Sequence, residues 1–167
     1  MAAVPETVYA RDGDAHLAYQ VVADNGPDLL FVPTGTFPID LLWDEPTVAG
    51  HLRRLASFSR LIMTDLLGVG SSDAVPIHDR PAMQAWTDGL VAVLDAVGSE
   101  CATVFGMSES ALPVMLLAAS HPHRVRSLVL CVRMRAFSAP TTIRTGCPNR
   151  RSPGTSTPLA TPSGVAV

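Results

Sequence analysis

Residues 101–120 read CATVFGMSESALPVMLLAAS, and this stretch decides the fold. Its opening residues are apolar or small, as in a buried strand, and the segment from Ser110 to Ser120 is mostly apolar, as in a buried helix. Ser108 lies between the two, with small residues, Gly106 and Ser110, two positions away on either side. Small residues are needed there because strand and helix approach closely around such a turn. The stretch therefore predicts a strained strand-turn-helix unit with Ser108 at its tip.

Strand and helix patterns alternate along the rest of the chain as far as Leu130. We expect a hairpin around Asp12-Gly13, followed by strands at 28–33, 61–65 and 125–130. A helix lies between the first two of these strands, with Thr47 as its N-cap and apolar residues at helical spacing: Val48, Leu52, Leu55 and Phe58. A second helix follows the strand at 61–65, runs from Met83 to Val97 and stops at Gly98. Such alternation favours a parallel sheet with right-handed crossovers. The predicted fold class is therefore α/β, with an N-terminal antiparallel hairpin and a mainly parallel sheet.

The composition changes after Leu130. Residues 131–167 contain five Pro, six Thr, four Ser and three Gly, with five Arg and no acidic residue. No hydrophobic periodicity follows, and such a composition is typical of a disordered segment. We therefore expect one folded domain over residues 1–130 and a Pro/Thr/Ser/Arg-rich, disordered tail over residues 131–167.

The charged residues argue against a nucleic-acid partner. The net charge is −3, and all 12 basic residues are Arg, because Lys is absent. They do not gather into a face interleaved with aromatic residues, as a nucleic-acid site requires. No stretch reaches the roughly 18 uncharged apolar residues of a membrane span, so no membrane partner is predicted either.

No cofactor and no metal are predicted. Cys101, Cys131 and Cys147 form no C-x-x-C pair and no even set, so they predict neither a zinc site nor a disulfide framework, and a cytoplasmic location suits them best. The histidines of His121-Pro122-His123 follow a helix end, where they more often cap carbonyl groups than bind a metal. The Gly68-Val69-Gly70 loop lacks the third glycine of a dinucleotide site.

The order of elements resembles the α/β-hydrolase superfamily over about residues 7–130. The motifs that carry the resemblance are the Leu29-to-Pro33 strand, Asp65-x-x-Gly68-x-Gly70-x-Ser72 and the serine turn. Three further stretches are especially similar to hydrolase-type domains joined to adenylate/guanylate cyclases, namely Tyr19-Gln20-Val21-Val22, Leu41-Leu42-Trp43 and Phe58-Ser59-Arg60-Leu61-Ile62. The resemblance implies an incomplete α/β-hydrolase fold, because only the front half of such a domain precedes the tail.

The serine turn suggests the chemistry of the site. In a strand-turn-helix context Ser108 is the candidate catalytic nucleophile, and the backbone amide of Glu109, at the helix N-terminus, is placed to stabilise an oxyanion. By the resemblance, the second oxyanion donor is the backbone amide of Gly35. The sequence departs from the family at Thr34 and Ser110, where glycine is usual, and at Leu67, where arginine is common. We expect Ser110 to relax the turn and Leu67 to leave a polar network incomplete.

The remaining members of a catalytic triad are missing from the sequence. In this fold the acid and the histidine follow the serine along the chain. No Asp or Glu follows Glu109, whose side chain we expect to point away from the site. His121 and His123 do follow, but a helix of about 12 residues would separate them from Ser108 by roughly 18 Å. A general base must come within hydrogen-bond reach, so neither histidine is expected to serve.

These residues predict a truncated serine-hydrolase-like protein of ester- or acyl-hydrolase ancestry that is inactive alone. If active, it would be an esterase-like serine hydrolase acting on a small ester or acyl substrate. A first alternative is a noncatalytic interaction module that forms homo- or hetero-oligomers through the sheet edge exposed after the strand at 125–130. A second alternative is a nonfunctional gene remnant.

Overall fold

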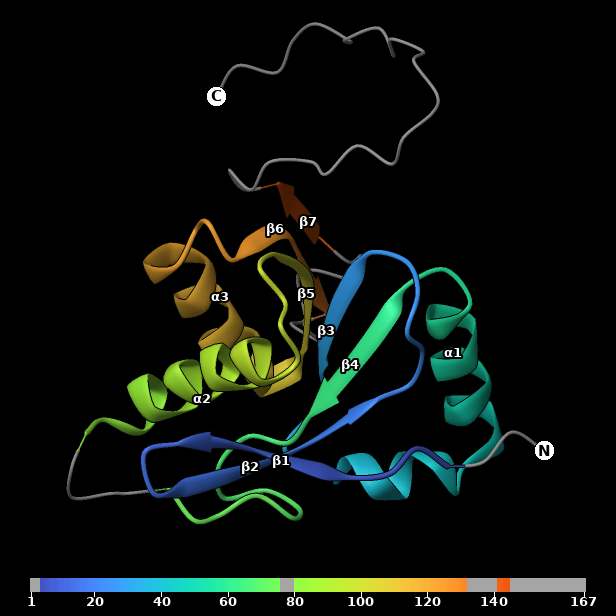
Figure 1. The fold of residues 1–167 in the computed structure, drawn as a ribbon, viewed down its shortest axis with the longest axis horizontal. Coiled ribbons are helices and arrows are strands. Elements are labelled where there is room, and N and C mark those ends of the chain that lie inside the picture. Colours follow the sequence, from blue (N-terminus) through green and yellow to red (C-terminus); the bar gives the residue numbers. More distant parts are fainter. Residues whose placement is uncertain (1–3, 76–79, 132–140, 145–167) are drawn as a thin grey trace, which may run out of the picture.

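A seven-stranded sheet forms the centre of the molecule (Figure 1). The computed structural model describes residues 4–75, 80–131 and 141–144, the last of these by their backbone only. The strands are β1 (Val8–Asp12), β2 (Ala15–Val21), β3 (Asp28–Val32), β4 (Arg60–Thr64), β5 (Ala102–Met107), β6 (Val125–Cys131) and β7 (Thr141–Arg144). Their spatial order is β1-β2-β4-β3-β5-β6-β7. The inner strands β4, β3, β5 and β6 are parallel, and β1-β2, β2-β4 and β6-β7 are antiparallel, so the predicted α/β class is confirmed.

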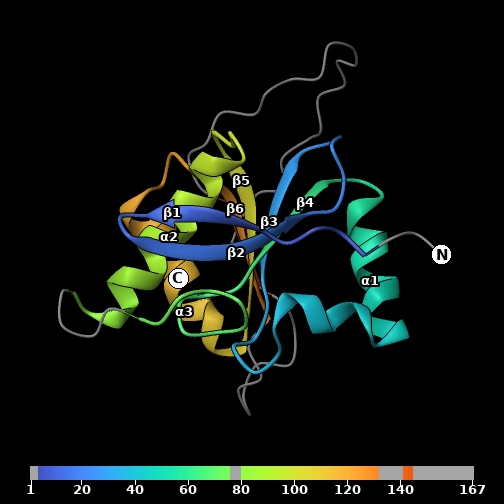
Figure 2. The same ribbon diagram turned by 60° about the horizontal axis from the view of Figure 1, so that its bottom comes forward.

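Helices cover both faces of this sheet (Figure 2). The helical segments are η1 (Ile39–Trp43), α1 (Pro46–Ala56), α2 (Ala82–Ala96), η2 (Ser108–Ser110) and α3 (Ala111–Ser120). Along β3, Leu29 and Phe31 pack in the cluster that contains α1, whereas Leu30 and Val32 pack in the cluster that contains α2 and α3. Neighbouring residues of a strand point to opposite faces, so a strand covered on both sides must be apolar throughout. This explains the uninterrupted apolar run that predicted β3.

The first long helix begins earlier than its sequence pattern suggested. The cap of α1 is Glu45, whose side chain accepts a hydrogen bond from the backbone N–H of Val48 at 2.7 Å, so the prediction of Thr47 as N-cap is wrong. Pro46 then occupies the first helical position, where its missing N–H costs nothing. Phe58 lies beyond the end of the helix and is 57% exposed, so it is not part of the apolar face.

The last strand, β7, lies in the segment after Leu130 that the sequence predicted to be disordered. Residues 141–144 form β7, which pairs antiparallel with β6, with Leu128 opposite Ile143. The prediction of a disordered tail is therefore wrong for these residues and for Cys131, which ends β6. Residues 132–140 and 145–167 lie outside the described part. The edge of β6 is occupied by β7, which also contradicts the expectation that β6 ends the sheet with an exposed edge. The domain boundary at residue 130 stays a prediction.

The cysteines differ from one another. Cys131, at the end of β6, is a free and exposed thiol, whereas Cys101, just before β5, is disulfide-bonded. The spacing of the cysteines suggested no disulfide framework and gave no signal for the disulfide of Cys101. The cytoplasmic location, which was inferred partly from these cysteines, stays a prediction.

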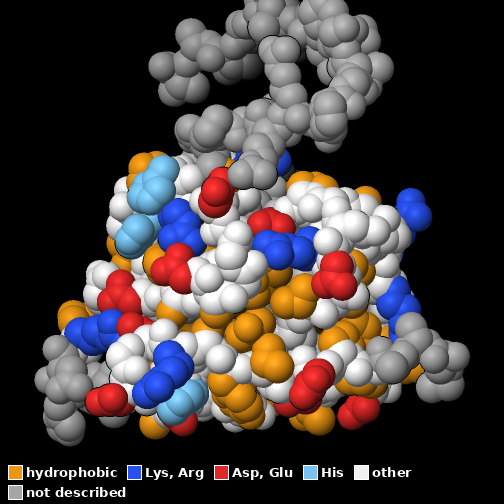
Figure 3. Space-filling model, in the orientation of Figure 1, with side chains coloured by type: hydrophobic (Ala, Val, Ile, Leu, Met, Phe, Trp, Pro, Cys, Tyr) orange, Lys and Arg blue, Asp and Glu red, His pale blue; other side chains and the backbone are white. Residues whose placement is uncertain are grey.

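Two further expectations concern the surface. Within residues 4–75, 80–131 and 141–144, no helix has the length and apolar character needed to cross a membrane. Acidic and basic side chains are interspersed on the face shown in Figure 3, with apolar side chains between them. This face therefore shows no continuous basic patch of the kind that binds a nucleic-acid backbone.

Candidate active site

Ser108 lies at the sharp turn between β5 and α3, at the carboxyl end of a central parallel strand. Its φ is +53°, and among the described residues it is the only non-glycine residue with positive φ. A side chain in this left-handed region costs free energy, so the surrounding packing must hold it there. Ser108 is also exposed, although it follows a buried strand. The strained turn predicted from the sequence is therefore confirmed, and it presents the serine hydroxyl to solvent.

The flanking small residues explain how this turn is held. A Cβ atom on Gly106 would lie 2.5 Å from Cγ2 of Val114 and 3.2 Å from Cα of Ala111, so only glycine allows α3 to pack this closely on β5. Ser110, on the other side, is fully buried, and its Oγ donates a hydrogen bond to the carbonyl oxygen of Pro33 at 2.5 Å. Its hydroxyl thus finds a partner, and Ser108 keeps its strained conformation. The expectation that Ser110 relaxes the turn is wrong.

The side chain of Glu109 points into the site rather than away from it, which corrects the expectation from sequence. Its Oε1 accepts a hydrogen bond from the backbone N–H of Gly35 at 2.5 Å. Hydrogen bonding to its own backbone N–H lowers the pKa of the Glu109 carboxyl below its ordinary value, against an opposing effect of desolvation. The Ser108 hydroxyl and the Gly35 N–H lower this pKa further. One of the two predicted oxyanion donors, the amide of Gly35, is therefore bonded to the carboxylate of Glu109.

A buried carboxyl, Asp65, holds the loop that carries Gly35. Asp65 follows β4, and its Oδ1 accepts a hydrogen bond from the backbone N–H of Ile39 at 3.0 Å. Burial raises the pKa of Asp65 to about 6, a shift that backbone hydrogen bonds from Ile39 and Ser71 oppose and the nearby charge of Asp40 increases. The acid of the Asp65 motif thus links the end of β4 to the loop after β3.

A polar network lies beside this loop. Gln20 is fully buried; its side-chain amide donates to Asp40 at 2.9 Å and accepts from Nε1 of Trp43 at 2.8 Å. Thr7 completes the network through hydrogen bonds with Gln20 and Asp40. Leu67, at the position where arginine is common in the resembled family, has its side chain buried in the apolar core.

Within residues 4–75 and 80–131, no hydrogen bond joins a histidine to Ser108. His121 is the C-cap of α3, at the opposite end of that helix from Ser108, and its ring contacts the Ser120 hydroxyl at 2.9 Å. The ring centroids of His121 and His123 are 6.2 Å apart. Among the described residues no cluster of three or more His, Cys, Asp or Glu side chains could hold a metal ion.

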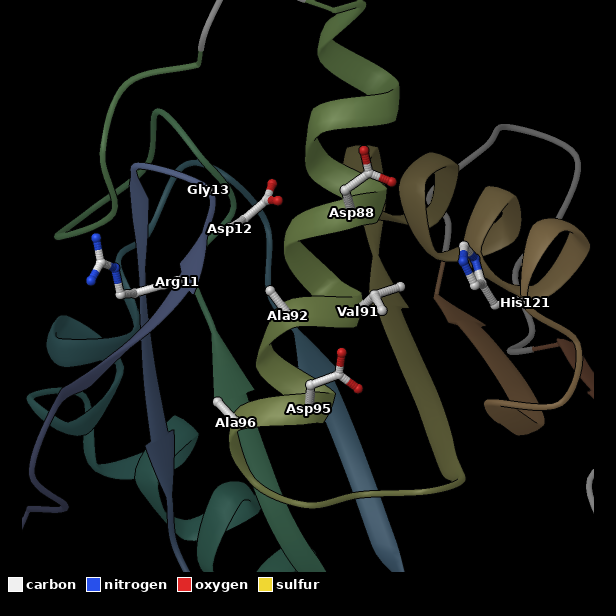
Figure 4. A pocket seen from close by; sticks show the side chains of 9 residues that line it. All are labelled: Arg11, Asp12, Gly13, Asp88, Val91, Ala92, Asp95, Ala96 and His121. Atoms are coloured by element: carbon white, nitrogen blue, oxygen red, sulfur yellow. The ribbon is translucent and has the colours of Figure 1, made fainter.

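A separate hollow of about 430 Å³ lies over α2, between the turn after β1 and the end of α3 (Figure 4). Neither the serine turn nor the loop after β3 lines it. Its acidic residues are already paired: Arg80 contacts Asp12 and Asp88, and Arg124 contacts Asp95 at 2.7 Å. Because each of these carboxylates forms an ion pair with an arginine, the hollow does not resemble an acid-base site.

The sheet order, the strained serine and the loop after β3 define an α/β-hydrolase fold, and comparison with solved structures agrees. A meta-cleavage product hydrolase from Pseudomonas fluorescens superposes with a TM-score of 0.61 and 19% identity, over 74% of this chain and 43% of that chain. Naproxen esterase from Bacillus subtilis superposes with a TM-score of 0.64 and 17% identity, over 76% of this chain and 42% of that chain. At such identities the likeness shows the fold.

Sequence relatives give the particular hydrolases to which the chain is similar. The 2-hydroxymuconate semialdehyde hydrolase of Pseudomonas putida is 36% identical over 85 residues, which are 51% of this chain and 30% of that protein. The corresponding hydrolase of Pseudomonas sp. strain CF600 is 41% identical over 76 residues, 46% of this chain and 26% of that protein. No family model matches the chain. The chain spans less than a third of these relatives, and the similarities support a hydrolase ancestry.

Sequence reasoning named Ser108 and, through the resemblance, Gly35 as candidate site residues, but it missed two contacts around them. The Ser110 tether could not be read from the sequence, since its acceptor, the Pro33 carbonyl, is 77 residues away. The Glu109 contact spans 74 residues, but it had a local signal: an acidic side chain adjacent to the serine, at a turn whose backbone amides point outward.

Proposed function

We propose that this chain is a truncated serine-hydrolase-like protein in which Ser108 is the nucleophile toward a small ester or acyl substrate. In the acylation step, the Ser108 Oγ forms a bond to the carbonyl carbon, the carbonyl oxygen becomes an oxyanion, and the departing alcohol takes up the serine proton. The Gly35 and Glu109 amides would stabilise that oxyanion. The single observation that carries the proposal is the exposed Ser108 at φ +53°.

Turnover by this chain alone is proposed to be weak or absent. A serine hydroxyl needs a base to remove its proton, and no histidine lies at the described turn. Members of a triad act as a unit, so a serine in an oxyanion site without them gives residual catalysis at most. The closer likeness to hydrolase-type domains joined to cyclases is part of this proposal and rests on the three stretches quoted above.

Labelling with a fluorophosphonate tests the proposal. In the reaction the Ser108 Oγ bonds to phosphorus, fluoride leaves, and the serine proton passes to solvent. We expect labelling of the purified chain that is lost in Ser108→Ala and retained in Ser120→Ala, which removes an exposed serine at the far end of α3. Light scattering on the same sample reports whether the protein is dispersed. Absence of label on dispersed, folded protein, both in the natural chain and in Glu109→Ala, would overturn the enzyme proposal.

The noncatalytic interaction module is the second candidate. It is favoured by one observation: the backbone N–H of Gly35, which catalysis would need, already donates a hydrogen bond to the carboxylate of Glu109. This contact favours a site that does not catalyse a reaction. Oligomers in light scattering, together with an unlabelled serine, would support it. The gene-remnant alternative predicts aggregation and the lack of a cooperative unfolding transition.

A further inference from the structure

The carboxylate of Glu109 accepts a hydrogen bond from the backbone N–H of Gly35, one of the two proposed oxyanion donors. Its Oε1 lies 2.5 Å from the Gly35 nitrogen. Its own backbone N–H, the Ser108 hydroxyl and the Gly35 N–H all lower the pKa of this carboxyl. A Cβ atom built on Gly35 would lie 3.3 Å from the same Oε1, so the carboxylate lies close against the loop as well as bonding to it. A negatively charged acceptor on an N–H group makes a short, strong hydrogen bond.

Two anions cannot share these donors. The oxyanion of a tetrahedral intermediate needs the same N–H groups, and a carboxylate beside it would oppose the developing negative charge. We propose that Glu109 is an inhibitory side chain that fills the oxyanion site of its own chain, so that a reacting carbonyl or phosphoryl oxygen must displace it. This inference rests on the proposed nucleophile, Ser108.

Displacement is sterically simple. Glu109 is the middle residue of the short segment η2 and is exposed to solvent, so its side chain can turn outward without disturbing the core. Gly35 is only partly exposed, and its loop is held independently through the hydrogen bond from Ile39 to Asp65. The donor site would therefore stay formed after the carboxylate leaves.

The same contacts allow an opposite role, in which Glu109 takes the proton of Ser108 as a general base. The two roles predict opposite effects of mutation. Removal of an inhibitory carboxylate speeds the reaction of Ser108, whereas removal of a base slows it. The lowered pKa of Glu109 agrees with the inhibitory role, because a weakly basic carboxylate accepts a proton poorly.

The rate of fluorophosphonate labelling in Glu109→Ala and Glu109→Gln decides between them. We expect the second-order rate constant in Glu109→Ala to rise by about tenfold or more, the effect of one hydrogen bond to a charged group. Glu109→Gln should show a smaller rise, since its amide oxygen still accepts from Gly35 but carries no charge. Glu6→Ala, the same charge change at an exposed residue near the N-terminus, should leave the rate unchanged. An unchanged or lower rate in Glu109→Ala would overturn the inference.

A second readout does not depend on the reactivity of Ser108. In Ser108→Ala, Glu109 still bonds the Gly35 amide, so added acetate should not shift the NMR signal of that amide. In Ser108→Ala/Glu109→Ala the amide is free of this carboxylate, so added acetate should shift its signal. Equal acetate shifts in the two proteins would contradict the inhibitory contact. If no variant is labelled but acetate shifts only the protein without Glu109, the proposed enzyme function fails while the carboxylate contact stands.

Discussion

The Oγ of Ser110 donates a hydrogen bond to the carbonyl oxygen of Pro33 at 2.5 Å, which joins the start of α3 to the end of β3. Both residues are buried. The contact ties the serine turn to the loop that carries Gly35, and it is a buried link between the two halves of the candidate site. A glycine at position 110, as is usual in the resembled family, could not make this contact.

Replacing Ser110 should therefore weaken the fold even where the new residue is smaller. Ser110→Ala leaves the Pro33 carbonyl without its partner, and we expect a loss of about 1–2 kcal/mol in the free energy of unfolding. Ser110→Gly should lose at least as much, because it also adds backbone freedom in the unfolded chain. Urea denaturation measures both. A Ser110→Gly protein more stable than the natural chain would show that the tether is not stabilising.

Gly106 should not tolerate even one added methyl group. In Gly106→Ala the new Cβ would lie 2.5 Å from Cγ2 of Val114, so α3 must shift away from β5. We expect a loss of about 1–3 kcal/mol, the range for overpacking in a core. Labelling of Ser108 should fall too, since the turn loses its strained geometry.

Gly50→Ala is the matched control for this substitution. Gly50 lies inside α1 and is exposed, and a Cβ atom added to it would meet only open space. Alanine there should raise stability by about 0.5–1 kcal/mol, since glycine is a poor residue inside a helix. Equal effects of the two substitutions would contradict the close-packing explanation.

Asp65 should make stability depend on pH in a defined window. Its pKa is about 6 in the folded protein against an ordinary 3.8, so between these values the folded state holds a proton that the unfolded chain has lost. The contribution of Asp65 to stability is therefore full below about pH 4 and lost as the pH rises through about 6. Asp65→Asn, which keeps an acceptor for Ile39 but no charge, should gain on the natural chain from pH 4 to 7. The gain should reach at most about 3 kcal/mol, at about 1.4 kcal/mol per pKa unit.

Urea midpoints at pH 4, 5, 6 and 7 measure this window. Asp14→Asn, at the exposed turn between β1 and β2, removes an equal charge and should show no such trend. A stability difference between Asp65→Asn and the natural chain that stays flat across the range would exclude a buried, proton-binding Asp65.

The ion pair of Arg60 and Asp28 should make stability depend on pH in the opposite direction, because its contribution is lost as the pH falls. They are neighbours in register on β4 and β3, and the guanidinium bonds both carboxylate oxygens at 2.7 and 2.9 Å. Burial acts to raise the pKa of Asp28, but hydrogen bonds from Arg60 and Ser99, together with the charges of Arg60 and Arg126, outweigh it and the pKa is lowered. Arg60→Lys cannot bond both oxygens and should cost about 1–2 kcal/mol at pH 7. The cost should shrink as the pH falls below 4 and Asp28 is protonated; a constant cost would contradict the pairing.

Much of the fold could be predicted because its signals are local. The apolar run of Leu29 to Val32 indicates a strand covered on both faces, and Gly98, at φ +64°, ends α2 where the pattern stops. Other features depend on partners distant in the chain. The pairing of β7 with β6 gave no periodic signal, and Glu45 replaces Thr47 as a cap because an acidic side chain also accepts a backbone N–H.

The candidate site shows the same division. The strained turn at Ser108 follows from small neighbours and could be predicted, whereas the direction of the Glu109 side chain depends on a loop 74 residues away. A sequence pattern predicts which backbone N–H groups at a turn are free to donate hydrogen bonds. It does not predict which side chain accepts those hydrogen bonds.

The antiparallel pairing of β7 with β6 also bears on reconstitution of a complete site from two polypeptides. A second chain supplying a catalytic acid and histidine could extend the parallel part of the sheet by adding its own strand next to β6. That position is held by the chain's own β7, from Ser127 opposite Arg144 to Leu130 opposite Thr141. Complementation would therefore begin as strand exchange, with its rate limited by the release of β7 rather than by encounter of the two fragments.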